Sequence, residues 1–135
     1  MYLLTKELYF PLVETASQEG VLAFGGDLSS ERLLLAYQSG IFPWYSQGEP
    51  ILWWSPNPRF VLFPDKVHTP KSMKRVLNQK VFQITFDLNF KQVIAHCAKI
   101  QRPYQKGTWI TDDMLKAYIK LLKLGYTHSV EVWQD

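Results

Sequence analysis

Residues 40–58, GIFPWYSQGEPILWWSPNP, constrain the fold more than any other stretch of the sequence. They hold three of the five tryptophans and four of the eight prolines. Because proline fixes φ and lacks a backbone N–H, a long helix is excluded here and a central strand is disfavoured. We therefore predict a stiff, largely extended segment. Its rings form either a wall of the core or a platform on which a flat ligand stacks.

Composition narrows the class of protein. With 135 residues, of which 47% are hydrophobic, the chain is long and apolar enough for one domain or two small lobes. A net charge of +3 is only weak evidence for a nucleic-acid partner. The single cysteine, Cys97, excludes an internal disulfide and fits a reducing cytosol. No apolar run is long enough to span a membrane, so we expect a soluble, cytoplasmic protein.

The first half of the chain predicts four local elements. They are an extended edge segment at 6–13, a tight turn at Gly25-Gly26, a helix at about 31–38 and a short strand at 59–63. Ser29 or Ser30 is a suitable cap for the helix, and Gly40 is suited to end it. Its expected buried face consists of Leu33, Leu34, Ala36 and Tyr37.

The second half predicts a helix at 70–78 capped by Thr69, followed by the order β-α-α-β. The four elements of that order are a half-buried strand at 81–86, a helix at 90–99, a helix at 112–124 capped by Thr111, and a strand at 128–133. A polar loop at 101–106 separates the last two helices. We expect no metal or other cofactor, because His68, His96 and His128 have no evident partners and Cys97 falls on an apolar helix face.

Positive charge gathers on one face of the predicted helix at 70–78. Lys71, Lys74 and Arg75 lie about a turn apart, away from the apolar residues of the same helix. This face is either simply solvated or a patch that contacts phosphates. The residues alone slightly favour the first reading.

Six stretches together resemble the leucyl/phenylalanyl-tRNA–protein transferases. They are LAFGGDLS (22–29), LLLAYQSGIFPWYS (33–46), PILWWSPNPR (50–59), HTPKSMKR (68–75), GTWIT (107–111) and LGYTHSVEVW (124–133). The resemblance implies an α+β fold with a small aromatic-rich lobe at 1–63. Residues 64–135 would then be the first β-α-α-β part of a domain similar to the GNAT acyltransferase fold.

The resemblance also implies an activity and a site. Such an enzyme moves leucine or phenylalanine from aminoacyl-tRNA to the α-amino group of an N-terminal arginine or lysine, which marks the acceptor protein for degradation. Trp44 and Trp109 would lie against the 3′-terminal nucleotide, in a cleft between the lobes. The basic helix with Lys71, Lys74 and Arg75 would face the acceptor stem, while Trp53, Trp54 and Trp133 would be structural.

The family extends for roughly another hundred residues, about the size that would complete a domain. Its catalytic residues belong to that part, so we expect none here, and we expect this chain to be a truncated member that is inactive alone. The chain stops shortly after the strand at 128–133, so we expect that strand to be swapped, completed by a partner or truncated. Its open edge would allow self-association. Two alternatives remain: a non-catalytic module that binds the tRNA 3′ end, and a structural fragment whose aromatic residues fill a core.

Overall fold

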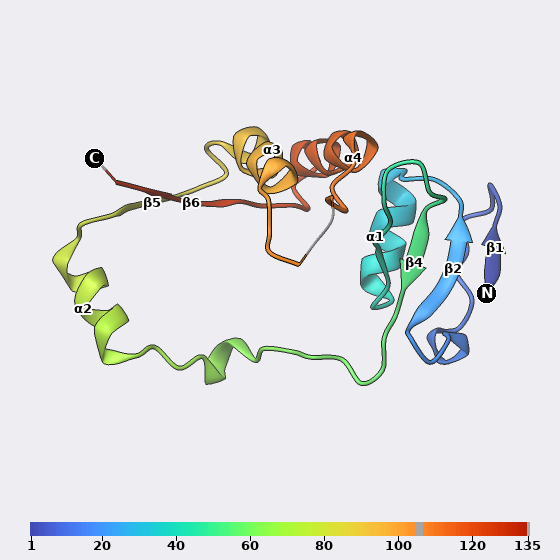
Figure 1. The fold of residues 1–135 in the computed structure, drawn as a ribbon, viewed down its shortest axis with the longest axis horizontal. Helices are drawn as coiled ribbons and strands as arrows, with labels where there is room; N and C mark the ends of the chain where they lie inside the picture. The colour runs from blue at the N-terminus through green and yellow to red at the C-terminus, as the bar shows by residue number, and fades with distance from the viewer. Residues whose placement is uncertain (105–106, 135) are drawn as a thin grey trace.

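The computed structural model describes residues 1–104 and 107–134 and has an α+β fold (Figure 1). Residues 105 and 106 of the predicted polar loop lie outside the described residues. One sheet and a helix lie within residues 1–54. A strand pair and two helices lie within residues 83–133. In the described ranges, no helix is long and apolar enough to cross a membrane.

The first sheet has four short strands in the order β1-β2-β4-β3. They are β1 (Tyr2–Leu4), β2 (Val21–Gly25), β3 (Phe42–Pro43) and β4 (Leu52–Trp54). Strand β1 is parallel to β2, whereas β4 is antiparallel to both β2 and β3. A 3₁₀ turn, Val13–Thr15, lies between β1 and β2.

Helix α1 (Ser30–Gln38) packs on this sheet. The side-chain oxygen of Ser29 accepts a hydrogen bond from the backbone N–H of Arg32, as expected of an N-cap. Gly40 follows the helix with φ of 72°, a conformation that glycine adopts without strain. The predicted buried face is only partly right: Leu33 and Ala36 are buried, but Tyr37 is 47% exposed. Arg32 is buried instead, because its guanidinium donates hydrogen bonds to the carbonyls of Thr5 and Glu7.

Residues 83–133 contain β5 (Gln83–Phe86), α3 (Phe90–Lys99), α4 (Asp112–Lys123) and β6 (Val130–Trp133). This confirms the predicted β-α-α-β order, and β5 pairs with β6 antiparallel. The side-chain oxygen of Thr111 caps α4 by accepting from the N–H of Met114. Leu121 of α4 belongs to the same apolar cluster as Leu33 and Trp53, so this helix closes the core of the first sheet.

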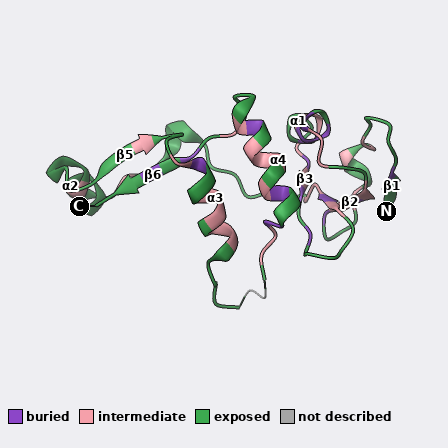
Figure 2. Cartoon of the chain, turned by 90° about the horizontal axis from the view of Figure 1, so that it is seen from above, coloured by how far each residue is buried: buried purple, intermediate pink, exposed green. Residues whose placement is uncertain are grey.

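Residues 55–82 connect β4 to β5, and most of them lie away from α1 and the first sheet (Figure 1). They include the 3₁₀ turn Pro64–Lys66 and helix α2 (Lys71–Gln79). Figure 2 shows buried residues concentrated in α1, the first sheet and the adjoining end of α4, whereas α2, β5 and β6 are mostly exposed.

Several predictions about individual strands are wrong. Leu52–Trp54 is an inner strand, because Pro50 and Pro56 flank it without entering it. Pro43 lies in the edge strand β3, where its missing N–H removes no hydrogen bond of the sheet. The segment at 6–13 forms no strand, since the edge strand is Tyr2–Leu4.

Residues 59–63 also form no strand. No strand of the described residues pairs with them, and the side chain of Phe60 is fully exposed. The predicted cap of α2 is wrong as well: Pro70 occupies the N-cap and no side chain bonds to the helix start.

The strand at 81–86 is shorter than predicted and its apolar face is not buried. Ile84 and Phe86 are 47% and 69% exposed, because no layer of the described residues covers that side of β5. Trp133 of β6, predicted to be structural, is 41% exposed, although its indole N–H donates to the hydroxyl of Thr85 at 2.9 Å.

Candidate functional site

Trp44 and Trp109 line one cavity of about 310 Å³, although they come from segments far apart in the sequence. Trp44 follows strand β3 and is 51% exposed, and Trp109 precedes helix α4 and is half-buried. The other lining residues are Tyr37, Phe42, Pro43 and Arg59. The structure thus brings together the two tryptophans singled out from the sequence.

The backbone of Trp44 is held from both sides. Its N–H donates to the carbonyl of Leu52 at 2.9 Å, and its own carbonyl accepts from the indole N–H of Trp54 at 2.7 Å. The two indole rings lie 6.1 Å apart with a tilt of 50°. Trp53, the next layer, is fully buried and donates its indole N–H to the carbonyl of Gly25. Trp53 and Trp54 therefore brace the segment that presents Trp44.

Trp109 is tied to that segment by a buried hydrogen bond. The hydroxyls of Tyr45 and Thr111 are 3.2 Å apart, and both residues are at most 9% exposed. Tyr45 follows Trp44 directly, and Thr111 is both the α4 cap and two residues beyond Trp109. The contact fixes the spacing between the two walls of the cavity.

A pair of tyrosines extends the wall behind Trp109. The edge of the Tyr118 ring meets Trp109 with 6.4 Å between ring centroids, and the hydroxyl of Tyr118 is hydrogen-bonded to that of Tyr37. Burial raises the pKa of Tyr118, and the neighbouring Tyr37 raises it further. Burial also raises the pKa of Tyr37, so both phenols are neutral over the physiological range.

Arg59 is the only charged residue among the described residues that line the cavity. Its Nη1 donates to the carbonyl of Gly40 at 2.7 Å, and its guanidinium carbon lies 5.0 Å from the centre of the Phe42 ring. The cavity therefore offers flat aromatic faces together with one fixed positive charge. Such a site suits a planar ring that carries an anionic group.

The basic residues of α2 do not join this cavity. Lys71, Lys74 and Arg75 are exposed, and both views place α2 far from the first sheet (Figures 1 and 2). The face that they form is open to solvent, so the structure supports neither reading of its charge over the other.

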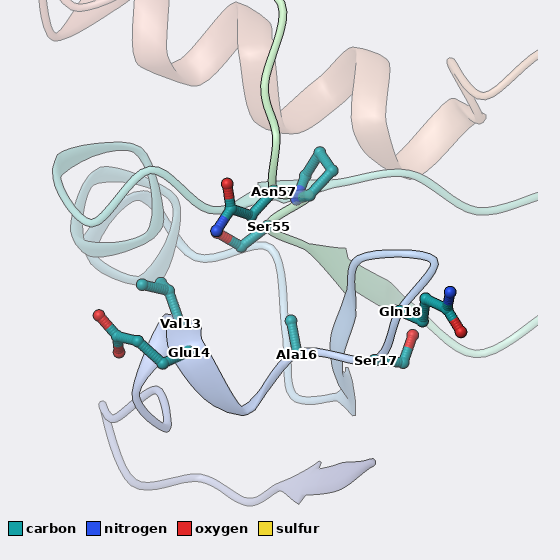
Figure 3. A pocket seen from close by; sticks show the side chains of 8 residues that line it. Val13, Glu14, Ala16, Ser17, Gln18, Ser55 and Asn57 are labelled. Carbon is teal, nitrogen blue, oxygen red and sulfur yellow. The ribbon is translucent and has the colours of Figure 1, made fainter.

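A larger cavity, about 440 Å³, lies between the 3₁₀ turn after β1 and the end of β4 (Figure 3). Its lining consists of Val13, Glu14, Ala16, Ser17, Gln18, Ser55, Pro56 and Asn57. The one charged residue in this lining is the acidic Glu14, and no aromatic ring is present. Size alone would favour this cavity, but its chemistry does not suit a nucleic acid, whose backbone is anionic.

The structure also pairs residues that the sequence left apart. His128 Nδ1 and Asp87 Oδ2 are 2.7 Å apart, and the hydrogen bond from His128 lowers the pKa of Asp87. In the described ranges, no group of three or more His, Cys, Asp or Glu side chains is placed to hold a metal ion. Cys97 is half-buried on α3.

Sequence reasoning missed two residues of the cavity wall. The helix pattern predicts a buried Tyr37, and Arg59 falls within the predicted strand at 59–63. The one signal that pointed to Arg59 was its place at the end of the aromatic and proline-rich stretch.

Comparison with known proteins identifies the family. The sequence model described as leucyl/phenylalanyl-tRNA protein transferase matches residues 61–135, and that of the family's N-terminal domain matches residues 26–57. The chain is 58% identical to the leucyl/phenylalanyl-tRNA–protein transferase of Flavobacterium johnsoniae over 135 residues, which is all of this chain and 64% of that protein. It is 60% identical to the one from Syntrophus aciditrophicus over 132 residues, 98% of this chain and 55% of that protein. The relative from Desulfatibacillum aliphaticivorans is 53% identical over 135 residues, with 58% of its length covered.

The chain thus spans between 55% and 64% of the length of these relatives. The match over residues 61–135 covers more than half of the chain. The chain belongs to the leucyl/phenylalanyl-tRNA protein transferase family.

Proposed function

We propose that this chain holds the 3′ end of an aminoacyl-tRNA, within an enzyme that transfers leucine or phenylalanine to the α-amino group of an N-terminal arginine or lysine. The product would be a substrate for regulated degradation in the cytosol. The observation that carries the proposal is the cavity shared by Trp44 and Trp109. Family membership supplies the substrate class.

The chemistry of the tRNA end fits this cavity. The terminal CCA is single-stranded, so its last adenine is available to stack on an indole face. Stacking of this kind is worth about 1–3 kcal/mol per base. The hydrogen bond between Tyr45 and Thr111 supports the proposal because it holds the two walls at a constant spacing before the ligand arrives.

The exposed cations of α2 are proposed to contact the acceptor stem. Lys71, Lys74 and Arg75 would bind phosphates without reading base sequence. That property suits an enzyme that must sense the attached amino acid rather than the identity of the tRNA. Helix α2 lies apart from α1 and the first sheet, which supports contacts to two separate parts of one tRNA (Figure 1).

The reaction itself is an aminolysis. The acceptor amine attacks the ester carbonyl, a C–N bond forms, and the ester C–O bond breaks so that the ribose hydroxyl leaves. The amine loses a proton to a base and the oxyanion needs hydrogen-bond donors. We propose that these groups lie outside residues 1–135, in the part of the relatives that this chain does not match. The domain that starts at residue 64 is proposed to be GNAT-like, on the strength of its β-α-α-β order.

The proposal is tested by the affinity of the chain for a fluorescent oligonucleotide ending in CCA. Trp44→Ala and Trp109→Ala should each weaken binding by about 5- to 150-fold, the range that corresponds to the loss of one stacking contact. Trp133→Ala, which removes an exposed indole on β6 outside the cavity, is the matched control and should bind like the wild type. Unchanged binding by folded Trp44→Ala and Trp109→Ala variants, with folding checked by circular dichroism, would refute the proposed site.

A further inference from the structure

The cavity contains a cation whose position is fixed before any ligand arrives. Arg59 Nη1 donates to the carbonyl of Gly40 at 2.7 Å, and the guanidinium stacks over Phe42 at 5.0 Å. The carbonyl of Gly40 also accepts from the hydroxyl of Ser55 at 3.3 Å, so Arg59 bonds to a backbone group that is itself held. Phe42 is two residues before Trp44, which places the charge beside the indole platform.

We propose that Arg59 binds the phosphate that joins the last two nucleotides of the tRNA, so that the cavity recognises a 5′-phosphorylated adenosine rather than a bare base. This role rests on the proposed function and adds a phosphate subsite to it. An anion of this kind always accompanies the terminal base of a nucleic acid. A fixed guanidinium beside a stacking surface suits that anion, because charge-assisted hydrogen bonds to phosphate are strong.

The charge of Arg59 is available to such a ligand. The two salt bridges among the described residues join Arg32 to Asp27 and His128 to Asp87, so neither neutralises Arg59. The bond to Gly40 uses one N–H of a guanidinium that carries five, and the planar fork of such a group matches the oxygens of a phosphate.

The charge of Arg59 also acts on a neighbouring side chain of the cavity wall. Burial raises the pKa of Tyr37, and the positive charge of Arg59 offsets part of this rise. The guanidinium therefore acts on a phenol that lines the same cavity. The cations of α2 have no such effect on Tyr37, and α2 lies apart from α1 and the first sheet (Figure 1).

A purely structural role is the competing explanation. In that case Arg59 would only fasten the chain at 59 to Gly40 and Phe42, and its removal would distort the cavity for every ligand. The two roles differ in one measurable respect: only phosphate binding depends on the charge of the ligand.

The test uses three probes: adenosine, the dinucleoside monophosphate CpA, and CpA with an uncharged methylphosphonate linkage. Affinities are measured by tryptophan fluorescence or calorimetry for the wild type, Arg59→Gln and Arg59→Lys. We expect the wild type to bind CpA about 10-fold or more tightly than its uncharged analogue, as for a hydrogen bond to a charged group. Arg59→Gln should lose this preference and bind adenosine within about 2-fold of the wild type, and Arg59→Lys should restore part of the preference.

Lys66→Gln is the matched control. Lys66 also lies over an aromatic ring, that of Phe63 at 5.3 Å, but it is outside the cavity. This variant should keep the full preference for charged CpA. An equal loss of adenosine and CpA in Arg59→Gln, or a wild type indifferent to the charge of the linkage, would overturn the proposed role while leaving the stacking site in place. Failure of the wild type to bind adenosine at all would overturn the proposed function itself.

Discussion

Replacement of Trp53 by alanine should remove a large part of the stability of the first sheet. Its side chain is fully buried, its ring meets Phe10 edge-on at 4.9 Å, and its indole N–H donates to the carbonyl of Gly25 at 3.0 Å. Burial of an aromatic side chain of 150–250 Å² at about 25 cal/mol per Å² is worth about 4–6 kcal/mol as an upper estimate. Measured tryptophan-to-alanine substitutions in cores cost about 3–5 kcal/mol, and we expect a loss in that range.

The free energy of unfolding is measured by urea denaturation followed by far-ultraviolet circular dichroism, because the substitution removes a fluorophore. Trp53→Phe, which keeps a ring but loses the N–H, should cost about 1–2 kcal/mol. Trp133→Ala is the control, and because its ring is 41% exposed it should cost clearly less than Trp53→Ala. If Trp53→Ala cost no more than this control, Trp53 would not be the centre of the core. The division of the aromatic stretch into structural Trp53 and ligand-binding Trp44 would then be wrong.

Three further predictions follow from other contacts. A triple variant with Lys71→Gln, Lys74→Gln and Arg75→Gln should weaken tRNA binding and reduce the slope of log affinity against log salt by roughly 2–3. An equal effect from a triple Lys→Gln variant of the exposed α4 lysines would contradict a specific role for α2. Tyr45→Phe should cost about 1 kcal/mol in urea denaturation and weaken adenosine binding several-fold, because it cuts the bond between the cavity walls; normal binding by this variant would refute that link. Hydrogen bonds from the hydroxyls of Ser129 and Thr85 hold the pKa of Glu131 below its usual range. Its stabilising contribution is therefore present at neutral pH and is lost as pH falls through the lowered folded pKa. The difference in melting temperature between wild type and Glu131→Gln should therefore shrink from about pH 7 to about pH 3, and a constant difference would count against it.

The helices within residues 83–133 were predictable because their signals are local. Thr111 caps α4 as expected, and α3 spans the predicted residues. Caps and 3.6-residue periodicity act within a few residues, so they can be read without knowledge of the rest of the fold.

The strands depended on partners that local patterns do not reveal. Leu52–Trp54 lies in a proline-rich stretch, yet it becomes an inner strand because β2 and β3 pair with it on both sides. Conversely, residues 59–63 have a strand-like composition but no strand pairs with them in the described ranges. Pairing between distant segments decided both cases.

The site was predicted through family resemblance rather than through periodicity. Tyr45 and Thr111 are 66 positions apart, and no pattern along the chain indicates that they meet. Arg59 was missed for a related reason, since the antiparallel pairing of β3 with β4, which brings Arg59 back beside Gly40 and Phe42, cannot be seen from local sequence.

The most direct test of the central claim is the fluorescence of 2-aminopurine in place of the terminal adenine of a CCA-ended oligonucleotide. If this base stacks between the walls that carry Trp44 and Trp109, its emission should be quenched on binding, and the quenching should be lost in the double variant Trp44→Ala/Trp109→Ala. A 2-aminopurine placed several nucleotides upstream should change far less. Equal quenching at both positions, or quenching that survives in the double variant, would contradict the assignment of this cavity to the terminal adenosine.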